Sequence, residues 1–215
     1  MTNQEPPPGP LRRGLATGRL EAFSDGVFAI AVTLLVLDIA LPASAERHLL
    51  RSLVDLWPSY LGYVVSVATI GAMWLGHNAI TDYLERVDVG FVRLNLLLLL
   101  FIAFLPFPTK LVAEFIGKDS PERVAVTVYG LNLLVASTLL LVLWRYAVRY
   151  RLVRPDAADE EVELLTKRLT PGLAGYLVLI LAGLFIPIVA VIGYLGIALF
   201  FIIPFRRRRH RPPRP

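Results

Sequence analysis

Long, unbroken apolar runs constrain the fold of this 215-residue sequence more than any other feature. Soluble cores are built from short alternations of apolar and polar residues, whereas here the hydrophobic residues, 56% of the chain, gather into continuous segments. A helix that rises 1.5 Å per residue needs about 20 apolar residues to cross a bilayer core of roughly 30 Å. The sequence therefore predicts an all-α integral membrane protein.

The apolar runs predict six membrane-spanning helices. Four of the runs each match one span, but the last, residues 173–205, would form a helix of about 50 Å, which is longer than a bilayer core is thick. Pro187 and Gly193 near its middle favour a turn and thus two short spans. The predicted spans are residues 21–42, 56–80, 89–109, 123–148, 171–189 and 191–205.

The distribution of Lys and Arg orients these spans, because cytoplasmic segments carry the excess of both residues. Six spans place 17 basic residues on one side and 5 on the other, whereas five spans would place 11 on each. We therefore expect a multi-pass protein with both termini in the cytoplasm. Residues 1–18 are then a disordered, proline-rich cytoplasmic lead and not a cleaved signal peptide, residues 19–205 the transmembrane domain, and residues 206–215 a basic cytoplasmic tail. A short surface helix is expected at 160–169.

The charge and the motifs of the chain exclude several functions. The net charge of +5 comes from the tail arginines between Arg206 and Arg214, which lack interleaved aromatic residues. This tail is typical of a topology determinant or a contact for anionic lipid and not of a nucleic-acid site. The chain has no cysteine, no nucleophile elbow and no zinc-protease motif. We therefore expect no enzyme activity, no cofactor and no fixed metal ion.

Polar residues inside a span are costly and mark candidate functional sites. On a helical wheel of the first span, Glu21, Ser24 and Asp25 point away from a face that is nearly all apolar. The alternating topology brings the start of the first span, the end of the second and the start of the third to one depth. We therefore predict an interhelical hydrogen-bond network at that depth. Its members are Arg19, Ser24, Asp25, Trp74, His77 and Asn95.

Three motifs in the first half of the chain carry a resemblance to a known family. Residues 19–37 read RLEAFSDGVFAIAVTLLVL, residues 74–77 read WLGH, and Asn95 is followed by a leucine run and by FLPFPT at 104–109. Together they resemble the first-helix signature and neighbouring motifs of the transmembrane protein 175 family of potassium channels, in its prokaryotic branch. The number of predicted spans agrees over the whole chain.

The resemblance implies a potassium-permeable cation channel without a carbonyl filter loop, and no Gly-Tyr-Gly string occurs in the sequence. In this family the first helix lines the pore. Carried onto this chain, the constriction is formed by Ile30, Leu34 and Leu37, with Thr33 as a polar ring; all four lie on the apolar face of the wheel. Because the motif occurs once, the resemblance implies a homotetramer around a central axis in the plasma membrane of a prokaryote.

The expected pore excludes water and ions by dewetting when it is narrow, because an Ile30 ring offers no ligand to replace the hydration shell of an ion. We therefore expect only a modest preference for K⁺ over Na⁺ and other monovalent cations. Asp38, at the outer end of the same helix, is expected to concentrate cations at the mouth.

Two other interpretations stay open at the level of sequence. A proton- or sodium-coupled secondary transporter using Asp25 and His77 is the main rival, although the first four spans lack the repeats and broken helices that transporters typically show. Without the resemblance, the apolar stripe would be a packing face. The Thr33 hydroxyl would then simply bond to a carbonyl one turn earlier.

Overall fold

The computed structural model describes residues 17–42, 48–118 and 120–203. Residues 1–16 of the predicted lead and the whole predicted basic tail lie outside these ranges. The described residues are helical, apart from loops and one isolated antiparallel bridge between Leu84 and Val153, which confirms the all-α membrane fold class. The helices are α1 Thr17–Leu35, the 3-10 turn η1 Val36–Asp38, α2 Leu49–Asp55, α3 Trp57–Thr81, α4 Val89–Phe104, α5 Pro106–Phe115, α6 Ser120–Arg149, α7 Asp159–Leu169, α8 Pro171–Gly183 and α9 Pro187–Ile202.

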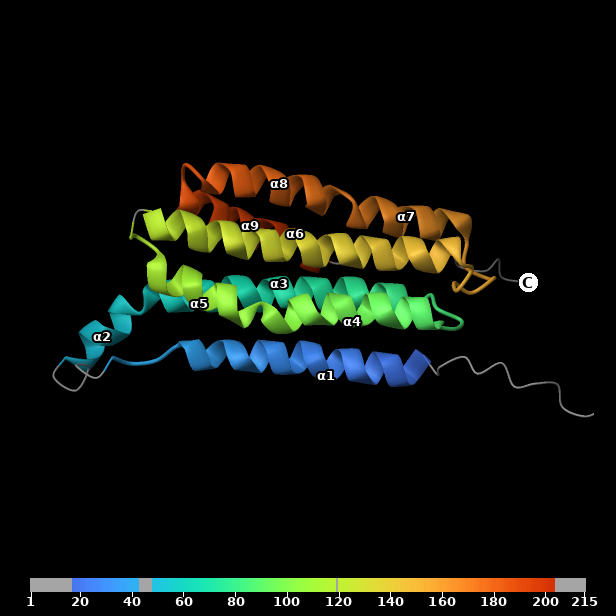
Figure 1. The fold of residues 1–215 in the computed structure, drawn as a ribbon, viewed down its shortest axis with the longest axis horizontal. Coiled ribbons are helices and arrows are strands. Elements are labelled where there is room, and N and C mark those ends of the chain that lie inside the picture. Colours follow the sequence, from blue (N-terminus) through green and yellow to red (C-terminus); the bar gives the residue numbers. More distant parts are fainter. Residues whose placement is uncertain (1–16, 43–47, 119, 204–215) are drawn as a thin grey trace, which may run out of the picture.

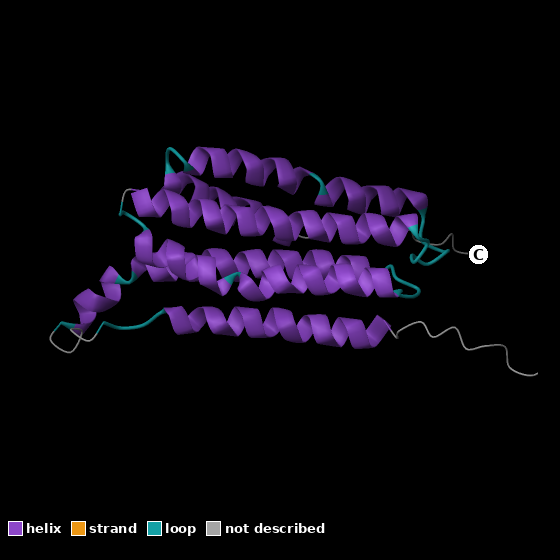
Figure 2. Ribbon diagram, in the orientation of Figure 1, coloured by secondary structure: helices purple, strands orange, loops and turns teal. Residues whose placement is uncertain are grey.

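The long helices lie side by side along one axis (Figure 1). Helix α1 forms one flank of the bundle, α7 and α8 form the opposite flank, and α3, α4 and α6 lie between them. Helix α9 packs against α3 and α8. Figure 2 shows how little loop separates the helices, with the short helix α2 projecting from one end of the bundle. Every long helix is therefore aligned as a membrane span would be.

Five helical stretches are long and apolar enough to cross a membrane. Their bounds are Thr17–Asp38, Trp57–Thr81, Val89–Phe115, Ser120–Arg149 and Asp159–Gly183, and α9 is a further, shorter apolar helix. The third stretch combines α4 and α5, which are separated at Leu105 because Pro106 cannot donate a backbone hydrogen bond. The fifth combines α7 with α8, so a helix is present at the expected residues 160–169, but it belongs to a stretch long and apolar enough to cross a membrane.

Prolines and one acidic cap set several helix boundaries. Asp88 caps α4 by accepting a 2.7 Å hydrogen bond from the backbone N–H of Phe91. Pro187 stands at the start of α9, where its missing N–H costs nothing. The turn between the last two helices therefore lies at residues 184–186, and α8 ends at Gly183, before the end of the predicted span 171–189. The chain turns before Pro187, whereas the prediction placed the turn after it.

The two ends of the bundle differ in their connections. The start of α1, the α3–α4 connection and the α6–α7 connection share one end, and helix α2, the α5–α6 connection and the α8–α9 turn share the other (Figure 1). Nine of the thirteen described Lys and Arg residues lie toward the first end, which we call the basic end. These nine are Arg19, Arg86, Arg93, Arg145, Arg149, Arg151, Arg154, Lys167 and Arg168, whereas Arg51, Lys110, Lys118 and Arg123 lie toward the other end.

A continuous apolar core joins α3, α4, α6 and α9. Trp144 and Tyr194 are fully buried in it. Helices α6 and α9 approach closely at Gly130, where the Tyr194 hydroxyl fills the space that a Cβ atom would need. This packing gives α1 a rigid support on one side only, because α1 contacts α3, α4 and α5 but not α6 to α9 beyond isolated pairs.

Candidate functional site

Helix α1 has one buried face and one exposed face. The buried face consists of Ser24, Phe28, Ala31 and Leu35, which recur at helical spacing and face α3 and α4. The Phe28 ring packs against the His77 ring, with 5.6 Å between centroids. This face fixes the position of α1 on the bundle, so the residues on the remaining face point away from the subunit.

Asn95 on α4 joins α1 to α3 through a chain of hydrogen bonds. Its Nδ2 donates to Ser24 Oγ at 2.9 Å, and its Oδ1 accepts from His77 Nε2 at 2.8 Å. Ser24 Oγ in turn donates to the Leu20 carbonyl at 2.8 Å. Because an amide oxygen only accepts, His77 carries its proton on Nε2. All three side chains are fully or almost fully buried, so the chain of bonds lies where unsatisfied groups would be costly. We call Ser24, His77 and Asn95 the polar anchor.

A second polar contact joins the same helices at the surface. Trp74 Nε1 on α3 donates to Asp25 Oδ1 on α1 at 2.9 Å, and both side chains are exposed. No hydrogen bond links Asp25 to His77 within the described part of the chain. Arg19 is exposed and forms no hydrogen bond or ion pair with any described residue. The six residues predicted as one network thus form two separate contacts, with Arg19 in neither.

The exposed face of α1 carries the residues predicted to form the constriction. Ile30, Leu34 and Leu37 are 60%, 42% and 71% exposed. Thr33 is also exposed, and its hydroxyl donates to the Ile30 carbonyl at 2.8 Å. This bond uses the only hydroxyl hydrogen, so the lone pairs of the oxygen remain available on the exposed face. Asp38 lies half-buried in η1, at the end of the stripe away from the basic end.

A buried hydroxyl cluster lies between α3, α5 and α6. Ser66 Oγ lies 2.7 Å from Thr109 Oγ1 and 3.0 Å from the Tyr129 hydroxyl. Sequence reasoning did not assign these residues to a site, because single hydroxyls in apolar runs usually bond to their own helix. The only signal was their placement in three different spans. In the described ranges no group of three or more His, Asp or Glu side chains is placed to hold a metal ion.

The comparisons with known proteins cover the part of the chain that holds these contacts of α1. Residues 19–106 match the family model described as "Endosomal/lysosomal potassium channel TMEM175", a range that contains the polar anchor and the exposed stripe of α1. A potassium channel of Streptomyces collinus is 41% identical over 162 residues, which cover 74% of this chain and 79% of that one. The chain belongs to the TMEM175 family.

Further relatives of this TMEM175-family chain include a bacterial protein named a potassium channel. A potassium channel of Chamaesiphon minutus is 44% identical over 163 residues, covering 73% of this chain and 80% of that one. The crystal structure of a lysosomal potassium-selective channel TMEM175 homolog from the same organism superposes with a TM-score of 0.78 and 39% identity, over 86% of this chain and 95% of that one. The chicken relative, which is 36% identical over 64% of this chain and 29% of its own, is named a proton channel. Proteins of this family are thus named as channels and not as enzymes.

Proposed function

We propose that this chain is one subunit of a homotetrameric, potassium-permeable channel in the plasma membrane of a prokaryote, with α1 of each subunit lining a central pore. The observation that carries the proposal is the division of α1 into an anchored face and an exposed apolar face. An exposed apolar stripe within a membrane must contact lipid, another subunit or a pore. The bacterial relatives named as potassium channels favour the pore.

In this proposal Ile30, Leu34 and Leu37 form three apolar rings around the axis. They are separated by four and three residues, or about 6 Å along α1 and about 5 Å where the chain enters η1. Such rings hold no ligand for an ion, so a narrow pore dewets and closes without a separate gate. Opening then requires only a small outward movement or rotation of α1.

Thr33 supplies the polar ring of this pore. Its hydroxyl hydrogen is committed to the Ile30 carbonyl, so its oxygen would face a passing cation with its lone pairs. Four such oxygens offset only part of the dehydration cost, and the preference for K⁺ over Na⁺ is accordingly modest. The Asp38 carboxylates lie at the far end of the rings and attract cations to that mouth.

The orientation in the membrane follows from the basic end of the bundle. Cytoplasmic segments carry the excess of Lys and Arg, so the basic end faces the cytoplasm, with both chain termini on that side. The polar anchor then lies in the inner leaflet, and Asp38 lies at the outer mouth. The anchor fixes the rotation of α1 and thereby selects the face that meets the axis.

A flux assay on the reconstituted full-length chain tests the ion and the mode of transport. Liposomes with a potassium gradient and no proton or sodium gradient should pass K⁺ down that gradient, because a channel needs no coupling ion. A flux that collapses without a proton or sodium gradient would instead indicate a transporter using Asp25 and His77. A pH dye inside the same liposomes measures proton passage, which would align this chain with the animal relatives named as proton channels.

A matched pair of substitutions tests the constriction. Ile30→Asn should raise the current through closed channels about tenfold, because a polar ring lowers the dewetting barrier by about 1.4 kcal/mol. Leu181→Asn on α8 is the control, because Leu181 is 62% exposed, close to the 60% of Ile30. It should leave the current unchanged. Equal currents in both variants and the unaltered chain would refute the assignment of the constriction to α1.

A further inference from the structure

A cavity of about 280 Å³ lies between α3, α6, α7, α8 and α9, on the flank opposite α1. Its walls are mainly apolar and include Met73, Leu140 and Leu169. Leu75 and Ile202 also line the cavity, and they are 40% and 36% exposed, so the cavity opens at the surface of the bundle. Apolar cavities do not hold water without polar partners, and hydrocarbon suits a cavity that opens toward lipid.

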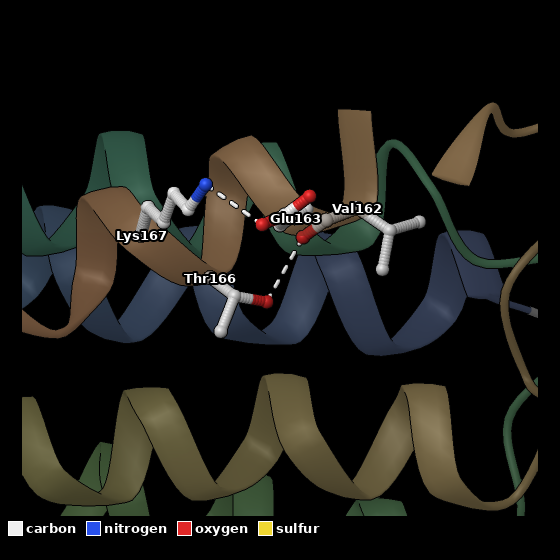
Figure 3. A network of polar contacts seen from close by, with 4 residues as sticks. All are labelled: Val162, Glu163, Thr166 and Lys167. Carbon is white, nitrogen blue, oxygen red and sulfur yellow. Dashed lines mark hydrogen bonds and ion pairs between the residues drawn. The ribbon is translucent and has the colours of Figure 1, made fainter. Parts of the chain in front are cut away.

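Arg168 at the end of α7 places a fixed positive charge on this apolar cavity. Its Nη2 donates to the carbonyls of Phe201 at 2.7 Å and Ile203 at 3.2 Å, which orients the guanidinium while its other nitrogens keep their donors free for a ligand. Within residues 17–42, 48–118 and 120–203, Arg168 has no ion-pair partner. Its neighbour Lys167 is paired with Glu163 at 2.7 Å (Figure 3).

Helix α7 is amphipathic and continues the line of α8 toward the basic end of the bundle (Figure 1). Leu165 and Leu169 are buried against the bundle, whereas Glu163 and Lys167 are exposed on the other side. Figure 3 shows the Thr166 hydroxyl turned away from the Glu163–Lys167 pair, toward the Val162 carbonyl. On the proposed orientation the end of α7, which carries Arg168 and leads into α8, therefore lies near the cytoplasmic interface, where lipid phosphates lie.

We propose that this cavity binds the acyl chain of an anionic phospholipid whose phosphate is held by Arg168. Basic pockets between spans on the cytoplasmic side are a recognised type of site for anionic headgroups. The lipid would bridge α7 to the end of α9 through the same guanidinium that already contacts Phe201 and Ile203. This inference rests on the proposed orientation and not on the pore assignment, so binding and conduction can fail separately.

Trp144 provides a reporter beside the cavity. Its Nε1 donates to Thr166 Oγ1 at 2.8 Å, one turn from the cavity-lining Leu140 and next to Leu165. The chain has three tryptophans, so the substitutions Trp57→Phe and Trp74→Phe leave Trp144 as the only one. The full-length chain carrying these two substitutions is reconstituted in unlabelled phosphatidylcholine. It is then titrated, in separate experiments, with brominated phosphatidylglycerol and with brominated phosphatidylcholine. Bromine on the acyl chains quenches tryptophan fluorescence, so quenching of Trp144 measures binding of the added lipid. Phosphatidylglycerol should quench with about fivefold higher affinity, the value for one arginine at about 1 kcal/mol.

Three substitutions in the chain that keeps only Trp144 test whether lipid binding depends on the charge of Arg168 and on the space in the cavity. Arg168→Gln keeps a donor for the carbonyls but removes the charge, and it should abolish the preference for phosphatidylglycerol, whereas Arg168→Lys should retain it. Ala72→Leu adds bulk to the cavity wall and should weaken quenching by both lipids. The Trp144 emission maximum checks that each variant is folded, and if Arg168→Gln is not, the other two still decide.

Several results would overturn the proposal. Equal quenching by the two lipids in the chain with Arg168 intact would show that there is no site for an anionic headgroup. A preference that persists in Arg168→Gln, or that disappears only when Arg206 to Arg209 are changed to Gln, would assign the charge contact to the tail. If Ala72→Leu does not weaken quenching, the acyl chain does not bind in the cavity.

Discussion

Helices α1 and α8 lie on opposite flanks of the bundle and expose similar apolar surfaces (Figure 1). Ile30 on α1 is 60% exposed and Leu181 on α8 is 62% exposed. They differ in polar content, because α8 carries no charged residue along Pro171–Gly183, whereas α1 carries Asp25 and the buried Ser24. Exposure alone therefore does not distinguish a pore face from a lipid face.

The two helices are also held in different ways. Helix α8 packs through apolar side chains and the Tyr176 ring, which lies 6.2 Å from the Tyr194 ring. Helix α1 is held by directional hydrogen bonds to α3 and α4. Hydrogen bonds lose strength steeply with angle, so they fix the rotation of a helix more narrowly than apolar contact does. A pore-lining helix needs that constraint, and a lipid-facing helix does not.

Thiol modification should give the largest difference between α1 and α8. The chain has no cysteine, so Leu37→Cys and Leu181→Cys each introduce a single thiol at sites that are 71% and 62% exposed. A water-soluble, cationic thiol reagent should block nearly all potassium current through Leu37→Cys, because only that thiol would face the aqueous pore. The current through Leu181→Cys should not change. Block at position 181, or none at position 37, would place the pore elsewhere.

Removal of the polar anchor should have the next largest effect. Asn95→Leu leaves His77 Nε2 without its partner in a buried site and should lower stability by about 1–2 kcal/mol. Asn132→Leu on α6 is the control, because among the described residues Asn132 makes a single hydrogen bond, 3.2 Å to the Phe101 carbonyl, and its Oδ1 has no partner there. Asn132→Leu should therefore lower stability by less than Asn95→Leu does.

The measurement for this pair is the unfolding midpoint in mixed micelles of increasing denaturing detergent. A larger loss for Asn132→Leu than for Asn95→Leu would show that the anchor is not what holds α1. Potassium flux in the same two variants separates stability from orientation, since only Asn95→Leu should also lower the flux per folded channel.

The long apolar helices and the two faces of α1 could be predicted from the sequence because each follows from local periodicity. A 3.6-residue repeat places Ile30 and Leu34 on one side of α1 and Phe28 on another, whatever the helix packs against. The break after α8 was predicted at the right proline but on the wrong side of it. A proline ends hydrogen bonding toward its own N-terminal side, so the new helix begins at Pro187 itself.

Sequence could not predict which polar side chains meet. Asp25 and His77 share a depth, yet Asp25 bonds Trp74 and His77 bonds Asn95. The choice depends on the rotation of α3 against α1, which no single-helix pattern encodes. The Ser66, Thr109 and Tyr129 cluster was missed for the same reason, because its members are 43 and 63 residues apart and meet only once three helices pack.

Selectivity should respond to Thr33 by a smaller factor. Thr33→Val keeps the shape but removes the oxygen, and it should lower the K⁺ to Na⁺ permeability ratio about twofold to threefold, since one hydroxyl ring offsets only part of the dehydration cost. Thr33→Ser should preserve the ratio. Thr138→Val on α6 is the control, because Thr138 is likewise exposed and donates to a carbonyl of its own helix, that of Leu134 at 2.7 Å. Reversal potentials under bi-ionic conditions measure the ratio, and an equal change at Thr138 would show that Thr33 has no special position.

The smallest effect is expected at the mouth of the proposed pore, where the turn η1 that follows α1 ends at Asp38 and α8 ends without a charge. Asp38→Asn should lower single-channel conductance by less than about twofold at low salt, because one carboxylate per subunit concentrates cations only within about a Debye length, and the difference should vanish near 1 M salt. Lys110 on α5 acts electrostatically on Asp38, so Lys110→Gln should raise the low-salt conductance. Glu114→Gln, on the same short helix α5, is the control for a carboxylate that does not belong to the first-helix stripe. A conductance loss for Asp38→Asn that persists at 1 M salt would mean that this carboxylate shapes the pore itself and does not merely supply it with cations.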